Sequence, residues 1–452
     1  MSHLLDIPAL LLSLAVVFGL LNHWFFKLPR TIGLVLIAML SALAYMAIDR
    51  AMPSLGLVAK VQQLLETIDL NKTLMEGMLS FLLFAGALHV NLEDLLKRKW
   101  LIGSLASFGV LLSTALNGLG FWALSQLFGL NFSLPICLVF GALISPTDPV
   151  AVLATLKTLA IPKELKAVIA GESLFNDGVA VVVFSLLVAV AFGINGHGEG
   201  AGNATAAVHA AGEAATSAAS QLPSVQQIAT LFATEALGGA VLGLGAGLLA
   251  FFAMRSLDDY VLEVMISLAL VTATYAIALH LHLSGPIAMV IAGLLIGNQG
   301  ATLAMSKKTR EHLELFWELL DEILNAVLFL LIGVEIVALS LALPLFGFAA
   351  GVIALAIVVR FIAIGLPVAL FRTRVAVQTG HTRILWWAGL RGGISVALAL
   401  SLPDFEGKDV VLAVTYGVVI FSILVQGLTI SRLLEIFYPQ AKSDKTADEQ
   451  GA

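Results

Sequence analysis

The chain has 452 residues, of which 59% are hydrophobic and only 12% are charged. Because soluble domains average roughly 25% charged residues, this composition excludes a soluble globular protein and predicts an integral membrane protein. The single cysteine, Cys137, excludes a disulfide framework or a thiolate metal cluster. The net charge of −6 gives no indication of a nucleic-acid partner, and membrane lipid is the expected surrounding.

Apolar runs separated by turn residues and charges predict thirteen transmembrane helices. They cover residues 5–26, 31–48, 73–90, 100–123, 134–154, 167–193, 225–254, 260–280, 286–298, 320–340, 345–371, 384–402 and 409–430. The first run lacks a preceding basic segment, so we expect a retained helix rather than a cleaved signal peptide. Of the 24 Lys and Arg residues, 18 then fall on one side of the membrane and four on the other. The positive-inside rule therefore predicts an external N-terminus and a cytoplasmic C-terminus.

The predicted helices 1–6 and 8–13 begin on opposite sides of the membrane, which indicates two inverted six-helix repeats. We expect four parts, namely a first repeat at 1–193, an external flexible loop plus connecting helix at 194–259, a second repeat at 260–430 and a cytoplasmic tail at 431–452. Helix 5 is interrupted at 145–149 and helix 12 at 389–393 by Gly and Pro. Although both residues are common in membrane helices, interruptions in corresponding helices of two repeats indicate a binding site near the membrane midplane.

Three carboxylates lie on the predicted helices 5 and 6, at Asp148, Glu172 and Asp177. A charge at membrane depth costs free energy, so intramembrane acids indicate a functional site. Ser173 lies one helical turn before Asp177, and Thr147 precedes Asp148. Because small hard cations prefer oxygen ligands, these four side chains predict a site for a cation such as sodium.

Two arginines, Arg360 and Arg391, also fall within predicted helices. We expect Arg360 to pair with Glu172, which leaves Asp177 as the group that a proton and a cation share. For Asp148 two other roles stay open, because this carboxylate is also placed to cap the broken helix or to pair with Arg391. Competition between proton and cation at one carboxylate produces exchange if the protein reorients only when that carboxylate is occupied.

At these residues the chain resembles the monovalent cation:proton antiporters of the NhaP and sodium/proton exchanger type. The resemblance covers nearly the whole chain. It is carried by PTDP at 146–149, GESLFND at 171–177, AGLLIGN at 292–298, LIGVE at 331–335, Arg360 and GLRGG at 389–393.

This resemblance implies an all-α, NhaA-like antiporter fold in a bacterial inner membrane, with crossing broken helices and a homodimeric assembly. A core bundle would move against a fixed scaffold in the manner of an elevator. It implies a transporter rather than an enzyme, without a cofactor. Because only 431–452 follow the last predicted helix, we expect no cytosolic regulatory domain.

The resemblance also assigns roles to the residues of the site. Asp177 would be the shared proton and cation ligand, and Na⁺ or Li⁺ would be held by Asp177, Asp148, Ser173 and Thr147. The orienting and ion-pairing residues would be Asn176, Glu172, Arg360 and Arg391, with the last in the crossing of the broken helices. Asn176 in place of an aspartate implies electroneutral exchange of one cation for one proton.

Several alternatives stay open at this point. Residue types do not distinguish Na⁺ from K⁺, so a K⁺/H⁺ antiporter of the same fold is the main alternative. An intramembrane aspartyl protease is a remote one, because no Gly-x-Gly-Asp motif is present. A channel is disfavoured by the inverted repeats.

Four further features have less certain roles. Glu335 is expected at a subunit or core interface rather than at the ion. The acidic stretch 307–322 is expected to be a solvated helix face, or else a vestibule that gathers cations. Residues 55–70 predict an amphipathic helix at the interface, and the Gly- and Ala-rich loop 194–224 predicts a flexible tether.

Overall fold

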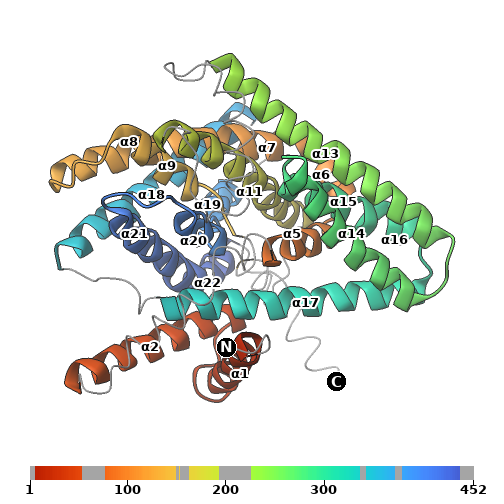
Figure 1. Cartoon of the computed structure of the whole chain (residues 1–452), viewed down its shortest axis with the longest axis horizontal. Helices are drawn as coiled ribbons and strands as arrows, with labels where there is room; N and C mark the ends of the chain where they lie inside the picture. The colour runs from red at the N-terminus through yellow and green to blue at the C-terminus, as the bar shows by residue number, and fades with distance from the viewer. Residues whose placement is uncertain are drawn as a thin grey trace.

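The structure is a computed structural model that describes residues 6–52, 77–148, 152, 162–192, 225–335, 343–371 and 379–437. All regular elements in these ranges are helices, which confirms the all-α fold class (Figure 1). The α-helices are α1 (Asp6–Leu21), α2 (Arg30–Ala51), α5 (Leu79–Leu88), α6 (Leu92–Lys97), α7 (Lys99–Ser104), α8 (Val110–Leu127), α9 (Leu134–Leu143), α11 (Lys163–Phe192), α13 (Val225–Arg255), α14 (Tyr260–His280), α15 (Gly285–Leu295), α16 (Ala301–Leu303), α17 (Lys307–Val334), α18 (Leu343–Phe371), α19 (Thr379–Trp387), α20 (Gly393–Leu400), α21 (Lys408–Phe421) and α22 (Gly427–Phe437). Short π-helical segments are η1 (Asn22–Phe26), η4 (Leu105–Gly109), η5 (Ile296–Gly300) and η7 (Ser422–Gln426).

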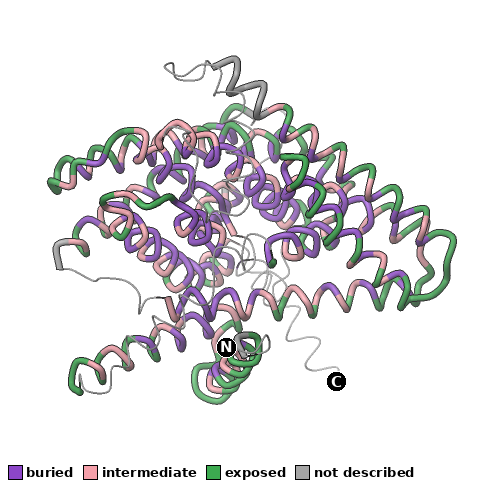
Figure 2. The backbone as a smooth tube through the Cα atoms, in the orientation of Figure 1, coloured by how far each residue is buried: buried purple, intermediate pink, exposed green. Residues whose placement is uncertain are grey.

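Within the described residues, nine helical segments are long and apolar enough to cross a membrane. The others that coincide with predicted spans are the short apolar helices α5 and α9, the partly charged α17 and the pair α19–α20. A helix therefore lies at each predicted span, while the number of crossings and the inverted repeat remain predictions. Buried residues concentrate where α9, α11, α20 and α21 meet, and exposed residues line the outer helices (Figure 2).

Some boundaries differ from those expected. The helix predicted from residue 320 begins at Lys307, because the Ser306 side chain caps it by accepting a hydrogen bond from the backbone N–H of Thr309. The first residues of the predicted tail, 431–437, are the end of α22. The predicted interface helix 55–70, the loop 194–224 and the tail from 438 onward lie outside the described residues, as do residues 149–151 and 153–154 at the end of the predicted helix 5.

Both expected helix interruptions are present. Helix α9 ends at Leu143, and residues 145–148 run without helical structure. Helix α19 ends at Trp387, and α20 begins only at Gly393. The two non-helical segments touch, since the backbone N–H of Asp148 donates a 2.8 Å hydrogen bond to the carbonyl oxygen of Leu390. This contact links the two parts of the chain on which the candidate site is built.

Candidate cation site at the crossing of two broken helices

The segment from Ser145 to Asp148 is bonded to other parts of the chain at each of its four residues. Because no helix continues through this segment, its backbone groups can form hydrogen bonds with neighbouring elements. Thr147 is buried and points at α11, where its Oγ1 lies 3.1 Å from the hydroxyl of Ser173. Asp148 is half-buried and lies against Gly392, where even a Cβ atom would overlap its carboxylate. Glycine at position 392 therefore permits the close approach of the second broken helix.

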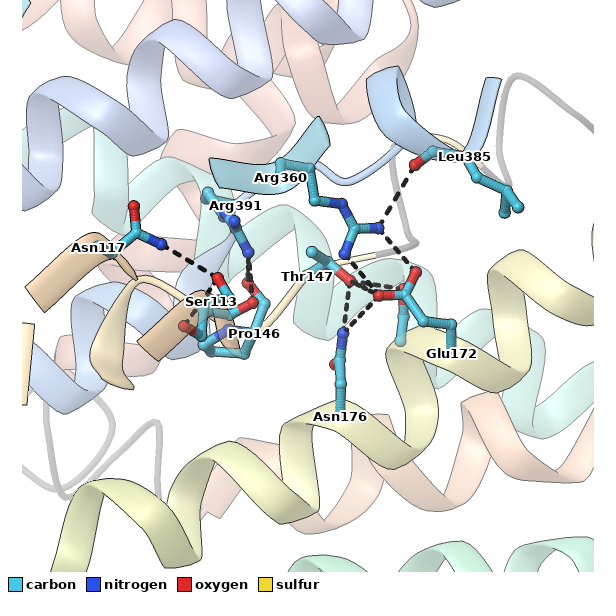
Figure 3. Close-up of polar contacts among 11 residues, drawn as sticks. Ser113, Asn117, Pro146, Thr147, Glu172, Asn176, Arg360, Leu385 and Arg391 are labelled. Atoms are coloured by element: carbon cyan, nitrogen blue, oxygen red, sulfur yellow. Dashed lines mark hydrogen bonds and ion pairs between the residues drawn. The ribbon is translucent and has the colours of Figure 1, made fainter. Parts of the chain in front are cut away.

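Helix α11 presents a row of buried polar side chains to this segment (Figure 3). The side-chain amide of Asn176 donates to Thr147 Oγ1 at 2.7 Å and to Glu172 Oε1 at 3.2 Å. Thr147 Oγ1 also lies 3.5 Å from Glu172 Oε1. Asn176 and Glu172 are one helical turn apart, so they lie on the same face of α11. The hydrogen bond from Asn176 then connects Thr147 to α11.

Arg360 of α18 lies opposite this row and binds Glu172 through its two terminal guanidinium nitrogens, Nη1 and Nη2, at 2.7 and 2.8 Å. The two side chains are only 9% and 4% exposed, so the pair is sequestered from water. Gly389 makes room for the guanidinium, because a Cβ atom there would overlap Arg360 Nε. The structure thus brings together Glu172 and Arg360 as a bidentate ion pair.

Arg391 lies in the crossing of the two broken helices and bonds to the backbone of the first one. Its guanidinium donates to the carbonyl oxygens of Ser145 and Pro146, the latter at 2.9 Å. Its own backbone N–H donates to the Ser422 hydroxyl in η7 at 2.8 Å. A fixed positive charge therefore holds the two carbonyls that precede Thr147.

Asp177 is 5% exposed on α11, and its Oδ1 has no hydrogen-bond partner among the described residues. Asp148 and Glu172 are near enough to interact with it electrostatically. Asn176 Oδ1 is likewise buried and unpartnered within the described part of the chain. Buried acceptor atoms that lack a hydrogen-bond partner indicate a place for a bound proton, water or ion.

The donor set fits a small monovalent cation. Asp177, Asp148, Thr147 and Ser173 supply oxygen atoms, which hard cations prefer, and sulfur ligands are not required. Glu172 is committed to Arg360, so Asp177 and Asp148 are the carboxylates of the site outside that ion pair. The described residues contain no group of three His, Cys, Asp or Glu suited to a transition metal.

One set of residues at the site was not predicted from the sequence. Helix α8 contributes three buried polar side chains, Ser113, Thr114 and Asn117, that bond to Ser145 or to one another. The available signal was their spacing, which places polar residues on one face of an otherwise apolar helix. It was overlooked because Ser, Thr and Asn also occur in membrane helices as ordinary packing residues.

Glu335 lies away from these contacts, at the carboxyl end of α17. Its Oε2 is buried without a hydrogen-bond partner in the described structure, and it interacts electrostatically with Tyr416 of α21. The structure does not bring Glu335 into contact with the row on α11. An interface position for Glu335 stays a prediction.

A helical membrane fold in which two interrupted helices cross beside buried carboxylates defines a secondary transporter. The model of the family described as "Sodium/hydrogen exchanger, transmembrane" matches residues 11–436, and the chain belongs to this family. Since its curated relatives are antiporters, the chain is a transporter rather than an enzyme, which sets the protease alternative aside.

The relatives cover between 80% and 98% of the chain. The Na(+)/H(+) antiporter NhaP of Pseudomonas aeruginosa is 43% identical over 98% of this chain and 99% of its own. The Na(+)/H(+) antiporter NhaH of Halobacillus dabanensis is 36% identical over 80% of this chain and 82% of its own. The solved sodium proton antiporter MjNhaP1 of Methanocaldococcus jannaschii shares the fold with a TM-score of 0.65, at 18% identity over 95% of this chain and 97% of its own.

Proposed function

We propose that this protein exchanges Na⁺, or Li⁺, for H⁺ across a bacterial inner membrane. The observation that carries the proposal is Asp177, a buried carboxylate with an unpartnered oxygen beside Asp148, Thr147 and Ser173. The names of the relatives, which describe Na(+)/H(+) antiporters, support sodium as the cation.

Asp177 is the ligand for which the two substrates compete. A proton on the carboxyl removes the charge that holds the cation, and a bound cation occupies the oxygens that a proton needs. Exchange follows if the core reorients only with Asp177 occupied. In this mechanism the crossing helices and α11 move as a core bundle against a scaffold, in the manner of an elevator.

One cation is exchanged for one proton. Glu172 is neutralised by Arg360, and position 176 carries an amide whose N–H₂ group is engaged by Thr147 and Glu172. Asp148, Glu172 and Asp177 together carry three negative charges against the two positive charges of Arg360 and Arg391, so one charge is left for a proton or a cation to balance. We further propose a homodimer of thirteen-helix protomers built on two inverted repeats, with the N-terminus outside and the C-terminus in the cytoplasm. No cofactor takes part in the cycle.

The decisive experiment uses purified protein in liposomes that contain a pH-sensitive dye. Addition of Na⁺ should dequench the dye by driving proton movement. Asp177→Asn should abolish this signal while the amount of protein in the liposomes and its oligomeric state stay unchanged. Asp404→Asn, a change of the same chemistry at an exposed loop residue paired with Lys408, should retain full activity.

Wild-type exchange in Asp177→Asn would reject the proposed site. In the same assay, a signal driven by K⁺ in preference to Na⁺ would favour the potassium alternative over the proposed substrate.

A further inference from the structure

Three side chains of α8 form a polar contact row against the non-helical segment that carries Thr147 and Asp148. Ser145 Oγ lies 3.0 Å from Ser113 Oγ, and Thr114 Oγ1 donates to it at 3.2 Å. Asn117 extends the row by donating to Ser113 Oγ at 3.1 Å (Figure 3). All four side chains are at most 5% exposed, so water does not substitute for these bonds.

Close packing of α8 on α9 holds the polar row at a fixed distance from Ser145. A Cβ atom at Gly141 would overlap the carbonyl oxygen of Thr114, and one at Gly118 would lie 2.9 Å from the Cα of Leu138. The two backbones therefore touch, as small residues allow in membrane helices. Since Ser145 follows α9 directly, α8 determines where the non-helical segment begins.

The opposite side of that segment is held by Arg391. Its guanidinium donates hydrogen bonds to the carbonyl oxygens of Ser145 and Pro146. Its positive charge also repels a cation from these two oxygens. Thr147 and Asp148 are thus the cation ligands that the segment offers. Thr147 is bonded to α11 by Asn176, and the segment that carries Thr147 and Asp148 is supported on two further sides, by the polar row on α8 and by the guanidinium in the crossing.

We propose that Ser113, Thr114 and Asn117 are positioning residues that determine cation specificity by fixing the width of the site. This inference rests on the proposed exchange function. Selectivity between ions of equal charge depends on cavity size and on the rigidity of the ligands. A rigid segment disfavours K⁺, which needs a wider cavity than Na⁺ or Li⁺.

The test is the liposome assay with Na⁺, Li⁺ and K⁺ as separate substrates. Ser113→Ala combined with Thr114→Val removes all three hydrogen bonds of the row. It should bring the half-maximal concentrations for Na⁺ and K⁺ closer together by at least roughly fivefold, which is the equivalent of a single buried hydrogen bond. Ser113→Thr, which keeps the hydroxyl, should retain the wild-type ratio. Ser125→Ala removes another buried hydroxyl of α8, whose bond runs to the Trp122 carbonyl, and is the matched control.

A merely structural role would lower the melting temperature of the double variant without changing the ratio of half-maximal concentrations, and that result overturns the inference. An unchanged ratio at unchanged stability overturns it as well. If the double variant does not fold, Asn117→Ala removes only the outermost bond and must still shift the ratio in the same direction. Absence of any cation-driven signal in the wild type would instead reject the proposed exchange function.

Discussion

At the scale of single residues, the three carboxylates of the site differ in what surrounds them. Both carboxylate oxygens of Glu172 accept hydrogen bonds from the guanidinium of Arg360. One carboxylate oxygen of Asp177, in contrast, has no hydrogen-bond partner among the described residues. Asp148 is placed by its own backbone bond to Leu390. The chemistry of each acid therefore follows from its partners, although the three side chains are nearly identical.

The Glu172–Arg360 pair gives a prediction about stability. Removing one partner of a buried ion pair leaves an uncompensated charge and costs about 3–5 kcal/mol. Glu172→Gln and Arg360→Met should each lower the free energy of unfolding by such an amount, measured by thermal unfolding in detergent. The double variant leaves neither charge unpaired, so its loss should be smaller than that of either single variant. Simply additive losses would show that the two side chains do not interact.

Sequence and structure agree best on features that are local in the chain. The interruptions at 145–148 and 388–392 were predictable, because Pro and Gly disturb a helix at the position where they occur. The row of polar residues on α11 followed from helical spacing alone. The polar row on α8 was not predicted, because Ser113 and Ser145 are brought together by packing of α8 on α9. Likewise the π-helical η7, which presents Ser422 to Arg391, has no sequence signature of its own.

At the scale of elements, α13 and α15 pack through a repeat of small residues. Gly239, Gly243 and Gly247 are spaced by four along α13, and Cβ atoms there would approach Ser284, Ala288 and Ala292, which have the same spacing. Small residues at this spacing let two membrane helices approach closely without polar bonds. The outward face of α13 is apolar and exposed, as suits contact with lipid.

This packing predicts opposite outcomes for two glycines of the same helix. Gly243→Ala should destabilise the protein by about 1–3 kcal/mol, because the new methyl group overlaps the carbonyl oxygen of Ala288. Gly245→Ala meets no atom within 4 Å and should be neutral or more stable by up to ~1 kcal/mol, from higher helix propensity. Thermal unfolding of both variants in detergent tests this difference. Equal stability of the two variants would contradict the close contact between α13 and α15.

At the scale of the whole molecule, the charges of the site determine how it responds to voltage. Three carboxylates, Asp148, Glu172 and Asp177, face two guanidinium groups, Arg360 and Arg391, which leaves one negative charge. In the proposed mechanism, one proton or one Na⁺ at Asp177 cancels it. If only the occupied core reorients, it carries no net charge in either direction of the cycle.

A membrane potential should therefore leave the initial rate of exchange unchanged. Moving one elementary charge across 100 mV is worth about 2.3 kcal/mol, so a step that carried net charge would respond by up to roughly fiftyfold. The measurement is the Na⁺-driven dye signal in liposomes, with a potential imposed by a K⁺ gradient and valinomycin. Equal rates at zero and −100 mV are expected for the wild type. Asn176→Asp is the informative variant, because it adds one negative charge beside Thr147 and Glu172. If that variant still exchanges, its rate should depend on voltage; voltage dependence in the wild type would mean that the occupied site is not neutral.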